Sequence, residues 1–256
     1  MNLREENNYV FDIRLTKLMG LYQILDPQTK RFLGRNVYHI AIAFIVMYVF
    51  TNTIVVSYSF LHYSYYLIDN MSTSMENLWL AENTFFILYK IWIIIHHSSK
   101  IWNCLSITRY GFTSFGFGRR HILDHWRERS IMFTALFTIM YYICPFIMIF
   151  ISHLFNKSIT PIHNRDGSVS YYRQNILNYY ILVSDETYNA NYHVFYFLEA
   201  SALLCIATLF IMFDVLLITL YFGICVQMNI IGSAFESVGH KSISGPHSPI
   251  DFYDVI

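Results

Sequence analysis

The sequence predicts an all-α, polytopic membrane protein, on the strength of its composition and the length of its apolar runs. Hydrophobic residues make up 55% of the 256 residues and charged residues only 13%, whereas soluble domains average about 25% charged residues. Four runs are long enough to cross about 30 Å of hydrocarbon as helices, which takes roughly 20 residues each. These runs lie at about 37–58, 77–96, 131–153 and 194–231.

The segment before the first run and the segment after the last run are expected to be cytoplasmic. Polar residues lead the chain, and the first apolar run starts too late for a cleaved signal peptide. The last run, at 1.5 Å per residue, is longer than a bilayer requires, so we expect its helix to continue into the cytoplasm. The chain thus divides into an N-terminal segment, a transmembrane region and a linker, at 1–34, 35–231 and 232–256.

The distribution of basic residues predicts which side each connection occupies. The N-terminal segment carries six Lys and Arg residues, and the three connections carry none, six and three. The positive-inside rule therefore places both ends of the chain in the cytoplasm. The two N-glycosylation sequons, at Asn70 and Asn156, both fall in connections assigned to the outside. With 17 basic and 17 acidic residues the net charge is zero, so bulk electrostatics does not suggest nucleic acid as a partner.

Several short motifs resemble those of insect odorant receptors. Asp214-Val215-Leu216, followed by Ile224-Cys225-Val226-Gln227, is similar to the inner half of that family's fourth helix. The segment Leu18-Met19-Gly20-Leu21-Tyr22 resembles the family's amphipathic entry segment, and the second outside connection is long and aromatic, with the pairs Tyr171-Tyr172 and Tyr179-Tyr180. A cytoplasmic N-terminus is also the family's topology.

The resemblance implies a function and a set of partners. Members of the family have seven helices, of which this sequence spans four, and the family's pore helix lies beyond them. The chain resembles an odorant-tuning subunit of a ligand-gated, non-selective cation channel, a heterotetramer formed with a common coreceptor. The implied partners are a small volatile odorant, the coreceptor and membrane lipid, with no cofactor. The implied location is the plasma membrane of olfactory sensory neuron dendrites.

The resemblance also places the odorant site in the outer half of the bundle, and this sequence offers an aromatic face on each helix there. Residues spaced three and four apart lie on one helix face. Aromatic rings with a few hydroxyl or amide groups suit a small, apolar, weakly hydrogen-bonding ligand. Packing between helices or against lipid is the alternative use of each ring. The candidate residues are Asn83, Phe86, Tyr89, Tyr142, Phe146, Ile149, Tyr196, Ala200 and Leu203.

Two isolated charges within apolar runs are candidates for a structural ion pair. Asp214 is the only formally charged residue between Leu203 and Gln227, and Lys90 stands alone in the apolar stretch from Phe85 to Ile95 of the second run. A charge near the bilayer centre costs at least about 2.5 kcal/mol, so it usually has a partner or a function. Counted from the helix centres at 1.5 Å per residue, both charges lie at the same depth. We expect them to pair, the alternative being that Lys90 snorkels toward the inner headgroups and a Tyr or Ser from the family's further helices, beyond these four, bonds Asp214.

Two other functional classes stay open at this point. His96-His97 and the His121-x-x-x-His125 spacing resemble the histidine boxes of membrane di-iron desaturases and hydroxylases, where imidazoles share a metal. Those enzymes use more histidines, and the remaining inside candidates, His240 and His247, lie far along the chain. Interfacial, solvated histidines are the simpler reading. A gustatory-type receptor is similar in fold to an odorant receptor and is the third possibility.

The basic-residue distribution leads to a direct test of orientation. We expect epitope tags placed before Met1 and after Ile256 to be reached by antibody only after the cells are permeabilised. Surface labelling of either tag on intact cells would overturn the orientation. A tag in the connection near Asn164 serves as the positive control, because the same rule places that connection outside.

Overall fold

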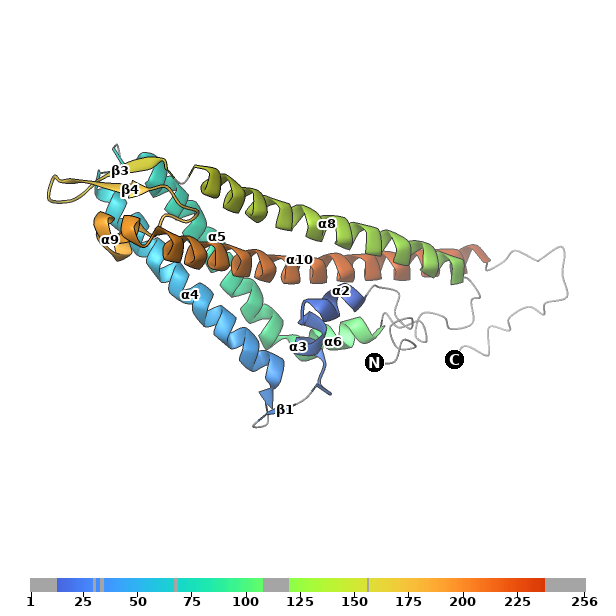
Figure 1. Cartoon of the computed structure of the whole chain (residues 1–256). Helices are drawn as coiled ribbons and strands as arrows, with labels where there is room; N and C mark the ends of the chain where they lie inside the picture. Colours follow the sequence, from blue (N-terminus) through green and yellow to red (C-terminus); the bar gives the residue numbers. More distant parts are fainter. Residues whose placement is uncertain are drawn as a thin grey trace.

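The computed structural model describes most of the chain, and the described part is almost entirely helical (Figure 1). The predictions for Asn156, for residues 1–12 and for the tail from 238 to 256 lie outside it. The described residues are 13–29, 31–32, 35–66, 69–107, 120–155 and 157–237. The elements before the second long helix are α2 (Ile13–Leu18), α3 (Leu21–Leu25), β1 (Arg31–Phe32), β2 (Arg35–Asn36), α4 (Val37–Tyr63) and η1 (Ser64–Tyr66). Those that follow are α5 (Met71–His96), α6 (Ser98–Ile107), α8 (Arg120–Leu154), β3 (Ile159–His163), β4 (Val169–Arg173), η2 (Tyr180–Leu182), α9 (Asp185–Ala190) and α10 (Tyr192–Ser237).

Four helices, α4, α5, α8 and α10, are long and apolar enough to cross a membrane. They correspond to the four predicted runs and confirm the predicted fold class. Each is longer than its apolar run: α8 begins at Arg120 and not near residue 131, and α10 continues through Ser237, into the expected linker. A helix, once nucleated, gains a backbone hydrogen bond with each added residue, so its ends extend past the point where apolar residues stop.

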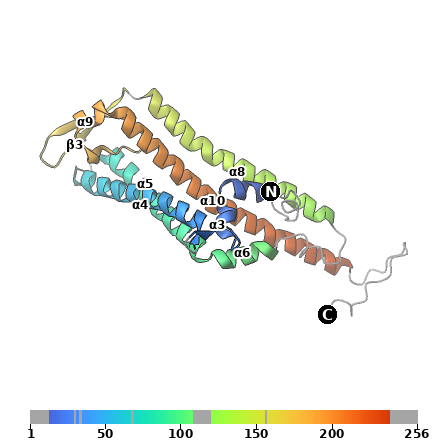
Figure 2. The same ribbon diagram turned by 60° about the horizontal axis from the view of Figure 1, so that its bottom comes forward.

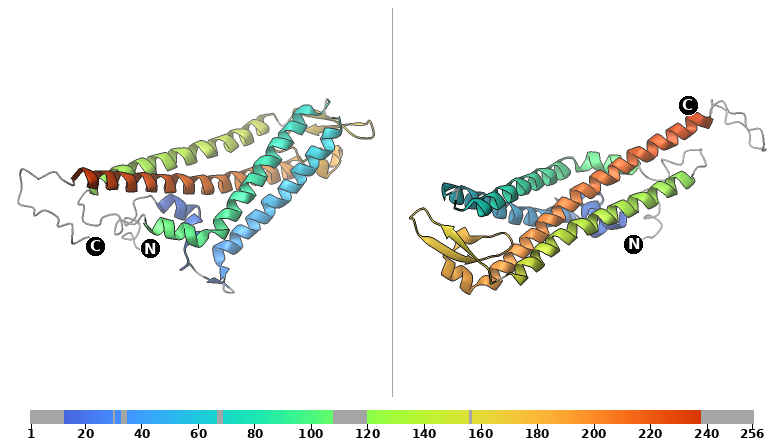
Figure 3. Two further views of the ribbon diagram at one scale, coloured as in Figure 1. Left: turned by 180° about the vertical axis from the view of Figure 1, so that it is seen from behind. Right: turned by 90° about the horizontal axis from the view of Figure 1, so that it is seen from above.

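Helix α10 is the central element of the bundle. α8 lies along one side of α10, while α4 and α5 pair with each other on the other side (Figures 1 and 2). The view from above shows α8 and α10 running side by side over most of their length (Figure 3). The main cluster of buried residues lies between α4, α5 and α10 and includes Val56, Ile87, Ile91 and Leu209. α10 is therefore the helix that contacts all three of the other long helices.

Short elements fill the end of the bundle that sequence analysis assigns to the cytoplasm. The expected amphipathic segment is present as two helices, α2 and α3, which Gly20 separates by adopting a left-handed conformation (φ 77°). Glycine allows this turn because it has no Cβ. The turn directs Leu21, Ile24 and Leu25 into the main core, and Tyr22 meets Trp102 of α6 edge-on. Helix α6 was not predicted from the sequence.

The opposite end is closed by an antiparallel hairpin, β3–β4, and by α9 (Figure 1). Asn70, at the start of α5, joins this hairpin to the bundle. Its amide nitrogen donates to the carbonyl of His163 and its amide oxygen accepts from the His163 N–H, both at 3.0 Å. The Asn70 side chain thus forms the two bonds that a neighbouring strand residue would form, and it is buried. Burial leaves no room for a glycan on this sequon.

We therefore expect Asn70 to remain unglycosylated although its sequon faces the predicted outer side. Replacing Ser72, the exposed third residue of the sequon, by alanine abolishes the acceptor pattern without removing Asn70. The Ser72→Ala chain should migrate on a denaturing gel identically to the parent. A faster-migrating variant would show that Asn70 carries a glycan and that its two bonds to His163 do not form.

Candidate functional site

Lys90 of α5 and Asp214 of α10 face each other across the bundle. The Lys90 Nζ lies 3.0 Å from the Asp214 Oδ1, and both side chains are about four-fifths buried. The structure thus brings together the two charges that sequence analysis placed at one depth. The attraction between an ammonium group and a carboxylate at this distance offsets much of the cost of removing the two charges from water.

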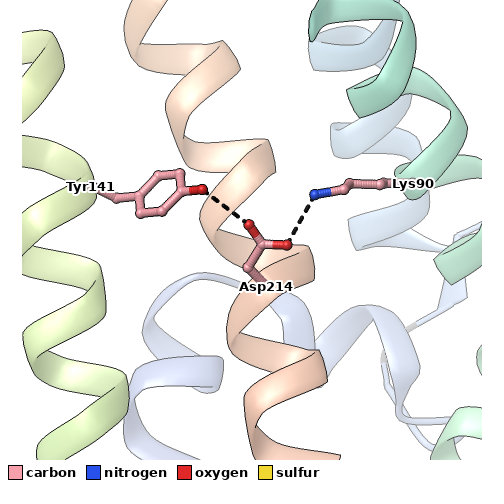
Figure 4. Close-up of polar contacts among 3 residues, drawn as sticks. All are labelled: Lys90, Tyr141 and Asp214. Atoms are coloured by element: carbon pink, nitrogen blue, oxygen red, sulfur yellow. Dashed lines mark hydrogen bonds and ion pairs between the residues drawn. The ribbon is translucent and has the colours of Figure 1, made fainter.

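Two further groups complete the environment of this ion pair. The Tyr141 hydroxyl of α8 donates to the other carboxylate oxygen, Asp214 Oδ2, at 3.4 Å (Figure 4). This distance is long for an O–H···O bond, so the ion pair is the stronger contact. The Lys90 ammonium also lies over two rings of α10, 4.6 Å from the centre of Phe210 and 4.9 Å from that of Phe213. Cation–π attraction of this kind contributes about 0.5–2 kcal/mol.

The result is a polar link between α5, α10 and α8 at one level. Asp214 accepts from α5 on one side and from α8 on the other (Figure 4). Tyr141 was not predicted from the sequence, since the alternative tyrosine partner was expected from helices beyond the four present. The available signal was the helical spacing of Tyr141 from Thr138 and Thr134, which marks a polar stripe on α8.

Five of the nine ligand-site candidates lie in the seam of α8 with α10 or in the adjoining core. The Tyr142 hydroxyl is 3.1 Å from the Thr208 hydroxyl, and the Tyr196 hydroxyl donates to the Ile149 carbonyl at 3.0 Å. Leu203 belongs to the main buried cluster, and Ile149, Tyr196 and Ala200 pack against it. Thr208 is a seam residue that sequence analysis did not select.

The other four candidates are not drawn into this seam. Asn83 donates to the Trp79 carbonyl of its own helix at 2.7 Å. Phe86, Tyr89 and Phe146 are each more than half exposed, so the described part of the chain does not cover them. Phe86 and Tyr89 are exposed rings of α5, and Phe146 is an exposed ring of α8.

A second polar network, near the N-terminal end of α10, was not anticipated from the sequence. The carboxylate of Glu199 is fully buried and accepts hydrogen bonds from Leu177, Asn178, Tyr179 and Tyr188. Burial, and then the nearby carboxylate, raise the pKa of Tyr188 above its ordinary value. The tyrosine hydroxyl therefore stays protonated and acts as a donor to Glu199 throughout the physiological pH range.

The described residues do not provide the set of metal ligands that the histidine-box hypothesis requires. The rings of His96 and His97 are neighbours, 4.8 Å apart, and His125 is exposed. Within the described ranges no group of three or more His, Cys, Asp or Glu side chains is placed to hold a metal ion. The His121 side chain and the whole of His240 and His247 lie outside the described part.

Comparison with known proteins gives one match. The family model described as "7tm Odorant receptor" matches residues 70–250, which is more than two thirds of the chain. The match begins at the start of α5 and includes both polar networks on α10. No curated protein and no solved structure matches the chain.

The Lys90–Asp214 contact predicts how paired substitutions behave. Removing one partner of a buried ion pair leaves an uncompensated charge and costs roughly 3–5 kcal/mol, whereas replacing both can be nearly neutral. Lys90→Met or Asp214→Asn alone should therefore lower the thermal stability and the surface amount of the protein. The Lys90→Met, Asp214→Asn double variant should recover part of the loss, as measured by thermal unfolding in detergent.

Lys100→Met is the matched control, because Lys100 is an exposed residue of α6 and its replacement should change stability little. Strictly additive losses in the double variant would show that the two charges do not depend on each other.

Proposed function

Because the chain belongs to the odorant receptor family, we propose that it is the odorant-binding, tuning subunit of a ligand-gated, non-selective cation channel. Membership of the family supports an odorant-sensing role, and four helices capable of crossing a membrane support a multi-pass membrane protein. In this proposal the subunit assembles with a coreceptor into a heterotetramer in the plasma membrane, with both ends of the chain in the cytoplasm.

The odorant site in this proposal lies on the outer half of α5, α8 and α10. The observation that carries it is the Tyr142–Thr208 contact, which places two hydroxyl groups in the seam of α8 with α10. Phe86 of α5 and Phe146 of α8 offer exposed rings on the two helices that flank α10. An apolar surface with a few fixed polar groups is the usual composition of a small-molecule site. The ligand class is therefore a small, mostly apolar molecule with at most one or two hydrogen-bonding groups.

The Lys90–Asp214–Tyr141 link gives this site a route to the rest of the molecule. Tyr141 and Tyr142 are consecutive residues of α8, and one bonds Asp214 while the other bonds Thr208. A ligand that moves α8 against α10 at Tyr142 thus also changes the distance from Tyr141 to Asp214. Ligand binding shifts a conformational equilibrium only through such a difference in contacts between two states.

The experiment that tests the proposed function is co-expression with a coreceptor and recording of odorant-evoked current. We expect cation current from cells that express both chains and none above the coreceptor-alone background from cells that express the coreceptor without this chain. Absence of any difference across a broad panel of volatile compounds would contradict the proposal.

Substitutions at the proposed odorant site should change which odorant is detected and not whether the protein folds. Loss of one ring or hydroxyl from a binding site alters ligand discrimination by about 1–3 kcal/mol. Tyr142→Phe and Phe146→Ala should therefore shift the dose–response midpoints of individual odorants by unequal factors. Phe44→Ala is the control, since Phe44 is an exposed ring on α4 outside the proposed site. Unchanged midpoints in surface-expressed Tyr142 and Phe146 variants would move the site elsewhere.

A further inference from the structure

Residues 175–180, between β4 and α9, form a segment that we call the outer plug. All six residues of the outer plug are buried, although connecting segments usually run over the surface. The plug inserts three side chains, those of Ile176, Leu177 and Tyr179, into the main buried cluster of the bundle. It is therefore part of the core at the outer end and does not merely connect two elements.

Glu199 holds the backbone of the plug. Its Oε2 accepts from the N–H groups of Leu177 at 2.6 Å and Asn178 at 3.0 Å, while its Oε1 accepts from the N–H of Tyr179 at 3.1 Å. The Tyr188 hydroxyl adds a fourth bond at 2.8 Å. A carboxylate has about four acceptor positions, so the four donors satisfy a charge that would otherwise be costly to bury.

The local conformation of the plug suits this contact. Asn178 has a left-handed backbone (φ 58°), which asparagine adopts more readily than most residues. A left-handed residue within a turn directs successive N–H groups toward one point and creates a concave anion site. Here the anion is the side chain of Glu199, supplied by α10 of the same chain.

The side chains of the plug reach the other two helices of the core. The Tyr179 hydroxyl donates to the Asn52 Oδ1 of α4, and the Asn178 amide donates to the Glu76 Oε2 of α5 at 3.1 Å. With Glu199 on α10, the plug contacts one polar group on each of three helices. Its position therefore depends on how these helices are arranged.

The plug also borders the proposed odorant site. Glu199, whose carboxylate holds the plug, is followed on α10 by Ala200 and lies three and four residues from Tyr196 and Leu203, on one face of that helix. Tyr196 in turn donates to the Ile149 carbonyl of α8. Tyr196, Ala200, Leu203 and Ile149 are ligand-site candidates. A ligand that approaches them from the outer end of the bundle meets the plug first.

We infer that the outer plug forms the outer wall of the odorant site and that Glu199 is the positioning residue that keeps it closed. This inference rests on the proposed function for its ligand, but not for its geometry. Opening the plug breaks the bonds from Leu177, Asn178 and Tyr179 to Glu199 together, since all three end on one carboxylate. Plug opening is thus a two-state event that both a ligand and the helix arrangement can bias.

The first test measures opening without any odorant. In intact cells that express the full chain, Leu177→Cys is treated with a membrane-impermeant thiol reagent, and the unsubstituted chain, with its four free cysteines, supplies the background. We expect slow modification of the new cysteine in the otherwise unchanged chain. Adding Glu199→Gln should raise the rate by about tenfold or more, because a hydrogen-bonded charge is lost.

A matched substitution separates the role of Glu199 from a general effect of removing a carboxylate at this end. Glu186 is an exposed acidic residue of α9, and Glu186→Gln should leave the modification rate of the cysteine unchanged. Equal rates in the Glu199→Gln chain and the parent, or fast modification in the parent itself, would overturn the inference.

The second test uses the channel, compared at equal surface amounts of each chain. A purely structural role for Glu199 would lower the surface amount and leave the odorant midpoints unchanged. A positioning role should shift the midpoints of Glu199→Gln by about tenfold and speed the decay of current after odorant removal. Unchanged midpoints and decay would refute the assignment of the plug to the odorant site. A parent chain without odorant response would instead refute the proposed function, while the labelling rates still decide whether Glu199 closes the plug.

A milder variant keeps both tests decisive if Glu199→Gln does not reach the surface. Tyr188→Phe retains the ring and Glu199 but removes one of the four bonds. It should raise cysteine modification by about threefold or more, in keeping with the loss of one hydrogen bond to a carboxylate. An unchanged rate in a Tyr188→Phe chain that reaches the surface would overturn the inference equally.

Discussion

The carboxylate of Asp214 has to be compensated within the bundle, and the arrangement of the helices follows from how this is done. Lipid tails are as apolar as leucine side chains, so the hydrophobic effect does not draw one membrane helix to another. Packing and polar contacts must set which faces meet and at what height. The ion pair with Lys90 fixes α5 against α10, and the bond from Tyr141 fixes α8 against the other side of the same residue.

The remaining helix, α4, is positioned by contacts of the same type. The Tyr48 hydroxyl donates to the Leu198 carbonyl of α10 at 3.0 Å and lies 2.9 Å from the Ser201 hydroxyl. Near the N-terminal end of α10, backbone amides of the plug compensate the Glu199 carboxylate as the Lys90 ammonium compensates Asp214. Glu199 and Asp214 thus organise two levels of the molecule along α10. Between these levels lie the part of the α8–α10 seam and the exposed rings that we assign to the ligand.

The sequence was sufficient to predict features that depend on composition and on helical repeat. Hydropathy located all four long helices, and equal depth in two apolar runs suggested the meeting of Lys90 with Asp214. Helix ends were less predictable, because the helical extension from Arg120 and the whole of α6 are polar enough to resemble a loop. Nothing in their composition distinguishes a solvated helix from a connection.

Sequence patterns could not predict the contacts that backbone groups make. The partners of Glu199 are amides of a loop whose course no periodicity describes, so a buried carboxylate near a helix end resembled an ordinary interfacial charge. Asn70 carries an acceptor sequon, yet its amide is engaged by His163 in a strand distant in sequence. The pairs Tyr171-Tyr172 and Tyr179-Tyr180 were recognised as aromatic, but the burial of Tyr172, Tyr179 and Tyr180 follows only from the tertiary fold.

Because α10 is long, its polar link at Asp214 can determine how movement at one end of the helix is transmitted to the other end. The helix has 46 residues and no interruption, so it is a stiff rod of about 69 Å at 1.5 Å per residue. Asp214 lies 22 residues after Tyr192 and 23 before Ser237, almost at the midpoint, which makes it the natural fulcrum of a lever with arms of about 33 Å. A tilt of about 5° around that point displaces the two ends by about 3 Å in opposite directions. A small displacement of the end of α10 that carries Glu199 would therefore displace the opposite end of the helix in the reverse direction.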